Sequence, residues 1–251
     1  SQTLEFLRKF RNKKLANALQ FKAGSYWGEQ PIVSGPTYVG AIVIFLFILG
    51  LLLVKNELRI WILLATIMSL MLAWGKNFMP LTDFFLDYFP GYNKFRAVSM
   101  ILVIAEFTIP LLAFIALNKF LSSNSKFEDL KKLKIAFYTA GGITLIFALF
   151  PNMFLDFLSE KDLTPISSGV KTPDGFLDGL IADRSSLLQS DSWRSFLFIL
   201  LSFGVLFAFI KEKLNKKYAI LLIGALLIAD MWNINKRYLN DEHFVRKNKV
   251  K

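Results

Sequence analysis

Long apolar runs alternate with short charged connectors along the chain, and this alternation is the main structural signal of the sequence. The runs lack the apolar and polar alternation at every second residue that membrane β-strands show. Helices of roughly 17 to 25 apolar residues cross a hydrocarbon core of about 30 Å, and shorter ones are accommodated by adjustment of the bilayer. We therefore predict an all-α fold, a polytopic transmembrane helix bundle of about six spans with short interfacial helices. The predicted spans are 38–54, 60–75, 98–118, 135–155, 195–210 and 218–234.

Lysine and arginine in the short connectors predict the orientation. Residues 55–59 contain Lys55 and Arg59, and residues 119–134 and 211–217 contain five and four lysines. Short basic connectors face the cytoplasm. The two termini are also basic, but long segments translocate largely regardless of charge, so we give the short connectors more weight. The predicted organisation is then an N-terminal extracytoplasmic amphipathic segment (1–37), a transmembrane region (38–234) and the start of an extracytoplasmic tail (235–251). Because the chain begins at Ser1 rather than at methionine, we expect it to be an internal segment of a longer protein.

Composition supports a membrane protein and excludes several classes of site. Hydrophobic residues make up 54% of the chain, the mean hydropathy is +0.46 and the net charge is +11. There is no cysteine and one histidine, His243, so disulfides and thiolate metal sites are excluded, and a histidine-rich metal site or a Ser-His-Asp triad is not expected. We expect no cofactor. In a membrane protein a basic excess reflects topology and anionic lipid, so the expected partner is the lipid bilayer and not nucleic acid.

Two extramembrane segments have amphipathic character. Residues 4–19 place leucine and phenylalanine on one helical face with basic residues between them; this predicts either an interfacial helix on anionic headgroups or a helix packed on the rest of a larger protein. Residues 171–195 begin with turn signals at Pro173–Gly175 and continue as an amphipathic run. We expect the second segment to cover the outer mouth of the bundle.

The segment 76–97 combines many aromatic rings with charges. Leu81–Asp87 reads as a short helix that Thr82 or Asp83 caps and that Pro90 and Gly91 end. Such a helix suits the membrane boundary, where rings meet acyl chains and polar groups meet water.

Two interpretations of this segment remain open. In the functional one, Lys94 and Arg96 bind the phosphate of a lipid, while Asp83 and Asp87, four residues apart on one face, orient a sugar hydroxyl or act as a base. In the other, the aspartates pair with nearby lysine or arginine and the rings form an ordinary aromatic belt. The candidate substrate-binding residues are Lys76, Asp83, Asp87, Tyr92, Lys94, Arg96 and Glu106.

Glu106 lies about eight residues inside the third predicted span, and Pro110 follows one turn later. A carboxylate at this depth costs a few kcal/mol on insertion scales, about 2.5–3.5 for Asp. It therefore lines a wet cavity, or it is a protonated or hydrogen-bonded structural group. Because Pro110 frees the carbonyl of Glu106 from its helical bond, we expect local irregularity there. Asp230, near the predicted end of the sixth span, is expected to be interfacial.

Three blocks of sequence resemble one family. SYWGEQPIVSGPTYVGA (25–41), MLAWGKNFMPLTDFFLDYFPGYNKFRAVSMILVIAEF (71–107) and DMWNINKRYLNDEHFV (230–245) are similar to the bacterial YfhO family of multi-pass membrane proteins. The resemblance implies a GT-C-like glycosyltransferase that takes sugar from a polyprenyl-phosphate carrier at the outer face of the bacterial cytoplasmic membrane. It also implies that residues 76–97 are extracytoplasmic. The segment Trp27–Gln30 then either enters the same cavity or forms a plain turn.

One departure leaves the catalytic residue unassigned. GT-C enzymes carry their catalytic acidic residue in the first extracytoplasmic loop, and no block of this chain matches that loop. The alternative is a non-catalytic membrane scaffold or a subunit of an envelope assembly, whose partners are other membrane proteins or the missing remainder of the chain. Glu106 and Asp230 alone point to a third class, an ion or proton carrier.

Overall fold

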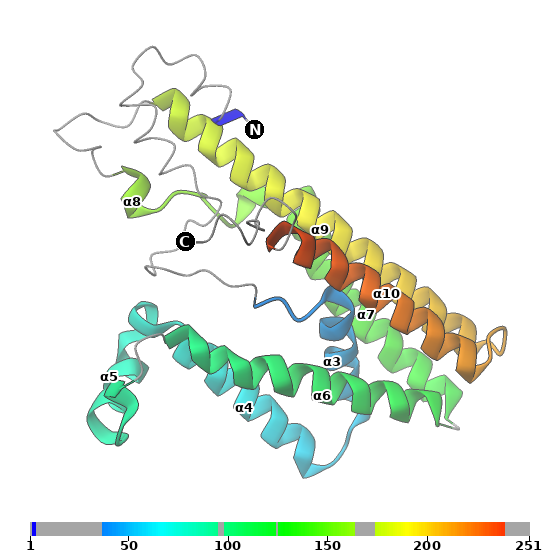
Figure 1. Ribbon diagram of the computed structural model, residues 1–251. Coiled ribbons are helices and arrows are strands. Elements are labelled where there is room, and N and C mark those ends of the chain that lie inside the picture. The colour runs from blue at the N-terminus through cyan, green and yellow to red at the C-terminus, as the bar shows by residue number, and fades with distance from the viewer. Residues whose placement is uncertain (1, 4–36, 95–97, 124, 164–173, 239–251) are drawn as a thin grey trace, which may run out of the picture. The chain divides into compact units, whose positions relative to one another are not determined.

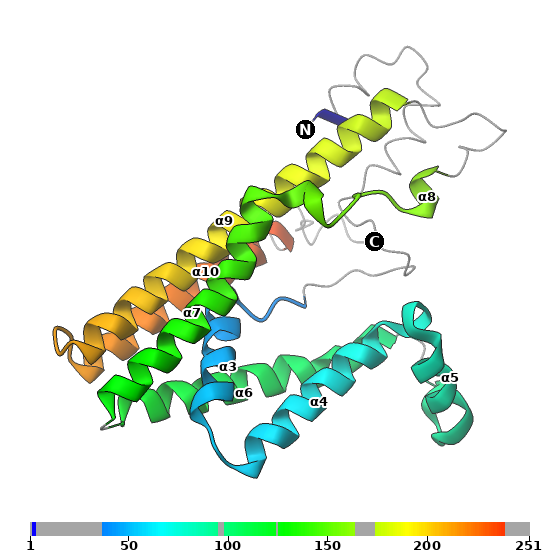
Figure 2. The same cartoon turned by 180° about the vertical axis from the view of Figure 1, so that it is seen from behind.

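The computed structural model describes residues 2–3, 37–94, 98–123, 125–163 and 174–238, and every regular element in these ranges is helical. Figures 1 and 2 show their arrangement from opposite sides. The α-helices are α3 (Ala41–Leu53), α4 (Glu57–Ala73), α5 (Met79–Tyr88), α6 (Leu102–Leu121), α7 (Lys126–Leu149), α8 (Glu160–Leu163), α9 (Asp174–Ile210) and α10 (Lys216–Tyr238). Short 3₁₀ turns are η1 (Gly75–Phe78), η2 (Tyr92–Lys94), η3 (Val98–Ile101) and η4 (Pro151–Met153). The all-α prediction is confirmed.

Four of these helices are long and apolar enough to cross a membrane, and the bent pair formed by α4 and the segment Gly75–Tyr88 would make a fifth span. The four helices are α6 with its preceding turn, α7, α9 and α10. Each of the six predicted spans overlaps one α-helix. The first, α3, has only 13 residues, about 20 Å at 1.5 Å per residue, and is shorter than the hydrocarbon core.

The chain divides into two compact units, and the division falls inside α7 and α9. Unit 1 contains residues 1–32 and 143–194, and unit 2 contains residues 33–142 and 195–251. Helix α9 has 37 residues, about 55 Å, which exceeds the hydrocarbon thickness of about 30 Å. Its apolar portion, 195–210, belongs to unit 2, and its polar portion, 174–194, belongs to unit 1. Residues 174–194, part of the segment expected to cover the outer mouth, are therefore helical, as their amphipathic run had indicated.

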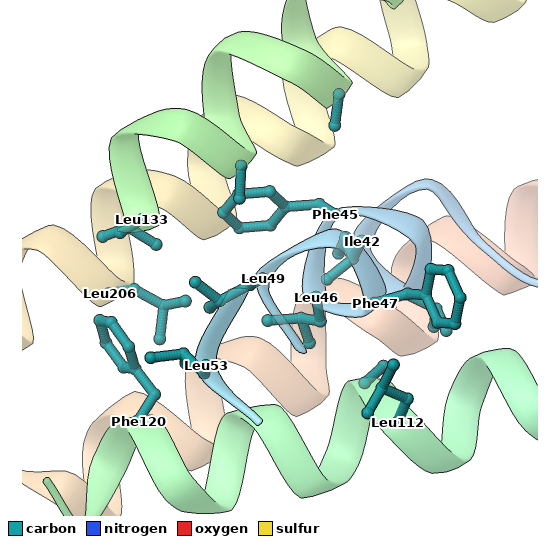
Figure 3. Packing of buried hydrophobic residues seen from close by; sticks show 14 of the residues in the cluster. Ile42, Phe45, Leu46, Phe47, Leu49, Leu53, Leu112, Phe120, Leu133 and Leu206 are labelled. Atoms are coloured by element: carbon teal, nitrogen blue, oxygen red, sulfur yellow. The ribbon is translucent and has the colours of Figure 1, made fainter. Parts of the chain in front are cut away.

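The core of unit 2 surrounds α3 (Figure 3). Ile42, Phe45, Leu46 and Leu49 are completely buried. They pack among side chains of α6, α7 and α9, including Leu112, Phe120, Leu133 and Leu206. A short helix at membrane depth is tolerated when protein rather than lipid surrounds its ends, which is the situation of α3.

Hydroxyl groups join α4 to α6, which lie side by side in both views (Figures 1 and 2). The hydroxyls of Thr66 and Thr108 are 2.7 Å apart, and either one can be the donor in this bond. The hydroxyl that accepts can donate to a carbonyl of its own helix, that of Ile62 for Thr66 or Ile104 for Thr108. Ser69 donates to the carbonyl oxygen of Ile101 at 2.6 Å. Hydroxyls of this kind typically bridge packed membrane helices, where no water competes for them.

Two predicted local details were wrong. Helix α5 begins at Met79, before Thr82, and neither Thr82 nor Asp83 caps it. The Thr82 hydroxyl instead donates to the carbonyl oxygens of Gly75 at 2.8 Å and Phe78 at 3.3 Å. Helix α6 is continuous through Pro110, because the single carbonyl that the proline leaves without a donor does not interrupt the flanking turns.

Candidate functional site

The helical segment Gly75–Tyr88 turns away from α4 at an angle of 110°. Gly75, with a φ of 50°, makes this turn, and the Thr82 hydroxyl ties α5 back to the Gly75 carbonyl. Helix α5 ends at Tyr88, and Gly91, three residues later, adopts a φ of 85°. The predicted short helix followed by a Pro-Gly stop is thus confirmed.

Aromatic rings form a connected cluster on α5 and η2. Phe85 lies at the centre, with ring centroids 5.3 Å from Phe89 and 5.5 Å from Tyr92. Phe84 lies 5.7 Å from Phe85 and 5.3 Å from Tyr88. The outer rings are exposed, Tyr88 by 74%. An exposed cluster of this size is typical of the aromatic belt at a membrane boundary.

Charges of the predicted site flank these rings. Asp83 and Asp87 are exposed on α5, Lys76 is exposed in η1 and Lys94 is exposed in η2. Within the described ranges neither aspartate forms an ion pair, and Lys94 forms none either. The predicted aspartate pairing therefore does not occur with Lys76 or Lys94. Arg96 lies outside the described residues.

Glu106 is on an outward face of α6, C-terminal to the segment 75–94. Its neighbours Val103 and Phe107 are 63% and 67% exposed, and the Glu106 side chain is exposed with them. In the part of the chain that the structure describes, its carboxylate has no hydrogen-bond or ion-pair partner. Neither of the two grooves described below includes Glu106 in its lining.

A buried ion pair organises unit 1. Arg184 of α9, 2% exposed, donates to Asp162 of α8 through Nη1 at 2.7 Å and Nη2 at 3.3 Å. The same Nη1 donates to the carbonyl oxygen of Phe157 at 2.7 Å. The backbone N–H and hydroxyl of Ser159 both donate to Asp162 at 2.9 Å. Burial alone would raise the pKa of Asp162, but hydrogen bonds from Arg184 and Ser159 outweigh it and hold that pKa below its ordinary value of 3.8.

A polar groove with a volume of about 400 Å³ runs along α9 in the same unit. Its polar lining residues are Asn152, Asp178, Ser185, Ser186 and Gln189, and its apolar ones are Ile181 and Ala182. We call it the polar groove. It contains one carboxylate and no lysine or arginine.

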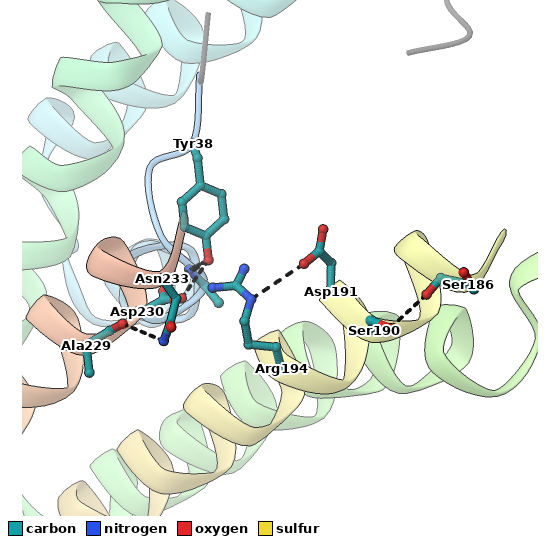
Figure 4. Close-up of polar contacts among 9 residues, drawn as sticks. Tyr38, Ser186, Ser190, Asp191, Arg194, Ala229, Asp230 and Asn233 are labelled. Carbon is teal, nitrogen blue, oxygen red and sulfur yellow. Dashed lines mark hydrogen bonds and ion pairs between the residues drawn. The ribbon is translucent and has the colours of Figure 1, made fainter. Parts of the chain in front are cut away.

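A second groove, of about 370 Å³, lies in unit 2 between α3, α6 and α10. Its lining is mainly apolar: Val39, Val43, Phe114, Leu227, Ile228, Met231, Trp232 and Asn235. Beside it, Asp230 is completely buried and accepts hydrogen bonds from the Tyr38 hydroxyl, 2.9 and 3.0 Å from its two oxygens (Figure 4). Asp230, expected to be interfacial, is therefore enclosed by protein and paired with Tyr38.

Sequence reasoning missed the burial of Asp162 and of Asp230. Asp230 was placed near the end of its span because the apolar run ends at 234, whereas α10 continues to Tyr238. The sequence pattern singled out neither Asp162 nor Arg184. The one available signal was the charge of Arg184 within an amphipathic helical run.

Comparison with known proteins adds no relative. The chain matches no family model, no curated protein and no solved structure. The resemblance to the YfhO family rests on its three sequence blocks, and the transferase reaction stays a prediction.

Proposed function

We propose that this chain is part of a membrane-embedded, GT-C-like glycosyltransferase that uses a polyprenyl-phosphate-linked sugar at the extracytoplasmic face of the bacterial cytoplasmic membrane. The observation that carries the proposal is the surface of residues 75–94, where exposed rings lie beside a lysine that has no counter-charge among the described residues. Four or five apolar helices provide the bilayer setting. The three blocks similar to the YfhO family supply the reaction class.

The chemistry of this surface fits a lipid phosphate. Lys94 presents a point charge with three donors, and Arg96, two residues later, adds a planar fork that binds phosphate oxygens in pairs. The exposed rings of Phe84, Tyr88 and Phe89 offer apolar contact to an isoprenoid chain at the boundary. Asp83 and Asp87, both exposed on the same helix, would then accept hydrogen bonds from sugar hydroxyls.

The test is carrier binding and sugar transfer by the protein in lipid nanodiscs, with Lys94→Ala and Arg96→Ala singly and together. Each substitution should weaken binding of polyprenyl phosphate by roughly tenfold, since it removes a charge-assisted hydrogen bond. Lys55→Ala is the matched control, because Lys55 is an exposed lysine in a connector predicted to face the cytoplasm. If the double variant binds and transfers as the wild type does, the phosphate role of these residues is wrong.

A non-catalytic scaffold is the second candidate. The observation in its favour is that neither described groove has a lysine or arginine in its lining, whereas a transferase that holds a phosphate needs a cation beside the reacting sugar. A scaffold predicts no measurable binding of polyprenyl phosphate, and no dependence of its assembly on Lys94.

A further inference from the structure

We infer that the polar groove of unit 1 binds a neutral, hydroxyl-rich ligand of the size of a mono- or disaccharide. The inference rests on the groove and not on the proposed transferase reaction. The volume of about 400 Å³ falls in the range of small-ligand pockets, roughly 300–1,000 Å³. Five of the seven lining residues are polar, which is unlike an apolar packing defect.

The side chains of the groove are held in place by hydrogen bonds that leave other atoms available. The Ser185 hydroxyl donates to Oδ1 of Asn152 at 2.7 Å, so the Nδ2 group of Asn152 keeps its two donors. Nε2 of Gln189 donates to the carbonyl oxygen of Ala148 at 2.9 Å, so Oε1 of Gln189 remains an acceptor. Two amide side chains are thereby oriented before any ligand binds.

Asp178 and Ser186 add further acceptors. The exposed carboxylate of Asp178 has no hydrogen-bond or ion-pair partner in the described ranges of the chain. The Ser186 hydroxyl donates to the carbonyl oxygen of Asp183 at 3.0 Å and keeps its lone pairs for a donor. The groove therefore offers one amide donor group and several acceptors.

This balance selects the chemical class. A sugar hydroxyl both donates and accepts hydrogen bonds. It can donate to the Asp178 carboxylate or to Oε1 of Gln189, and it can accept from Nδ2 of Asn152. A phosphate only accepts and would meet a carboxylate with no cation in the lining. Arg184, the nearest arginine in sequence, points its guanidinium to Asp162 and Phe157 instead. The groove thus differs in chemistry from the basic surface around Lys94.

The test is saturation-transfer NMR on the chain in lipid nanodiscs, which avoids detergents with sugar headgroups. The probes are methyl α-glucoside, methyl α-galactoside, N-acetylglucosamine and maltose, with inorganic phosphate and ethanolamine as charged comparisons. At least one neutral sugar should bind. Asp178→Asn and Gln189→Ala should each weaken that binding, the former by roughly tenfold, because it removes a hydrogen bond to a charged group.

Asp156→Asn is the matched control, because Asp156 is an exposed aspartate of the same unit outside the groove, and its binding should equal that of the wild type. The inference is overturned if no neutral sugar binds, if both aspartate variants bind equally, or if only phosphate or ethanolamine shows dependence on Asp178. If Lys94→Ala loses carrier binding but still binds the sugar, the result supports both the sugar site in the groove and the separate phosphate site of the proposed transferase. If a sugar binds but Lys94→Ala does not weaken carrier binding, the result supports sugar binding in the groove and contradicts the proposed transferase.

Discussion

The carboxylate of Asp230 in α10 accepts the backbone N–H of Ala41, the first residue of α3, at 2.9 Å across 189 residues of sequence. The first N–H groups of a helix have no partner inside the helix. The residue before α3 is Gly40, which has no side chain and a φ of 98°, so it cannot cap the helix itself. The Tyr38 hydroxyl is a second acceptor for the Ala41 N–H, at 3.0 Å. The Tyr38 hydroxyl binds both oxygens of Asp230 and completes the arrangement (Figure 4).

Asp230→Ala should lower the free energy of unfolding by about 2–3 kcal/mol. The substitution removes a helix cap, worth about 1 kcal/mol, and it takes the charged acceptor from the Tyr38 hydroxyl, while the Ala41 N–H keeps its bond to that hydroxyl. Unfolding of the protein in mixed micelles would measure the loss. Asn233→Ala is the control on the same helix, because the exposed Asn233 amide bonds only to the carbonyl of Ala229 one turn away, and it should change stability little. Equal stability of the two variants would show that the Asp230 contact contributes nothing.

Gly50 should not tolerate alanine. A Cβ atom on Gly50 would lie 2.8 Å from Cγ of Leu112 and 3.0 Å from the carbonyl oxygen of Leu112. The first atom belongs to a fully buried side chain and the second to the backbone of α6, so neither moves freely. We expect Gly50→Ala to destabilise the protein by about 1–3 kcal/mol, the usual effect of overpacking.

The matched substitution is Gly224→Ala in α10. A Cβ atom there meets nothing within 4 Å, and alanine is favoured over glycine in a helix by about 1 kcal/mol. Gly224→Ala should therefore be neutral or stabilising in the same unfolding measurement. A similar loss of stability in both variants would argue that α3 and α6 do not approach as closely as described.

The ion pair of Asp162 and Arg184 should make unit 1 sensitive to acid. Because the pKa of Asp162 is lowered in the folded state, its stabilisation is present above the ordinary value of 3.8 and is lost as the pH falls through the folded value. Asp162→Asn should cost about 3 kcal/mol at pH 6, since it leaves a buried guanidinium uncompensated, and this difference from the wild type should shrink below the ordinary pKa. Protease resistance of residues 143–194 at pH 6 and pH 3 would report it. A cost that stays the same at both pH values would contradict the charged state of Asp162.

Helix positions could be predicted from the sequence, but several helix lengths could not. Lipid requires a continuous apolar stretch and an internally bonded backbone, so the apolar runs locate all six segments. Outside the apolar stretch, lipid no longer decides where a helix ends. The helix continues as long as its side chains pack against other parts of the protein. Helix α9 begins 21 residues before its predicted span, and Arg184, within that extension, is buried against Asp162.

For the candidate site, too, some features could be predicted from the sequence and others could not. The ring-rich segment 75–94 could be located because its composition and its Pro-Gly stop are local signals. The partners of Asp230 and Asp162 could not be predicted, since they lie 189 to 192 and 22 residues away in sequence and come together only through packing of separate helices. Asp83 and Asp87 show the opposite case, because one interpretation paired them with nearby lysine or arginine, and neither forms an ion pair with Lys76 or Lys94 in the described structure.

The orientation in the membrane can be predicted from unit 2, where two basic connectors lie at the same end. Lys126 forms an ion pair with Glu212, and Lys216 donates to the Ser122 hydroxyl at 2.9 Å. These contacts join the turn between α6 and α7 to the turn between α9 and α10. Because both turns are basic, the positive-inside rule assigns this end to the cytoplasm.

The absence of cysteine makes the assignment directly testable. In spheroplasts, Asp87→Cys should react with a membrane-impermeant maleimide added outside, whereas Lys213→Cys should react only after the membrane is permeabilised. Both positions are exposed, so burial does not explain a lack of labelling, and the wild type serves as the unlabelled control. The opposite pattern would place Lys94 and its ring-rich surface in the cytoplasm, where an extracytoplasmic carrier phosphate could not reach it, and it would remove the physical basis of the proposed transferase.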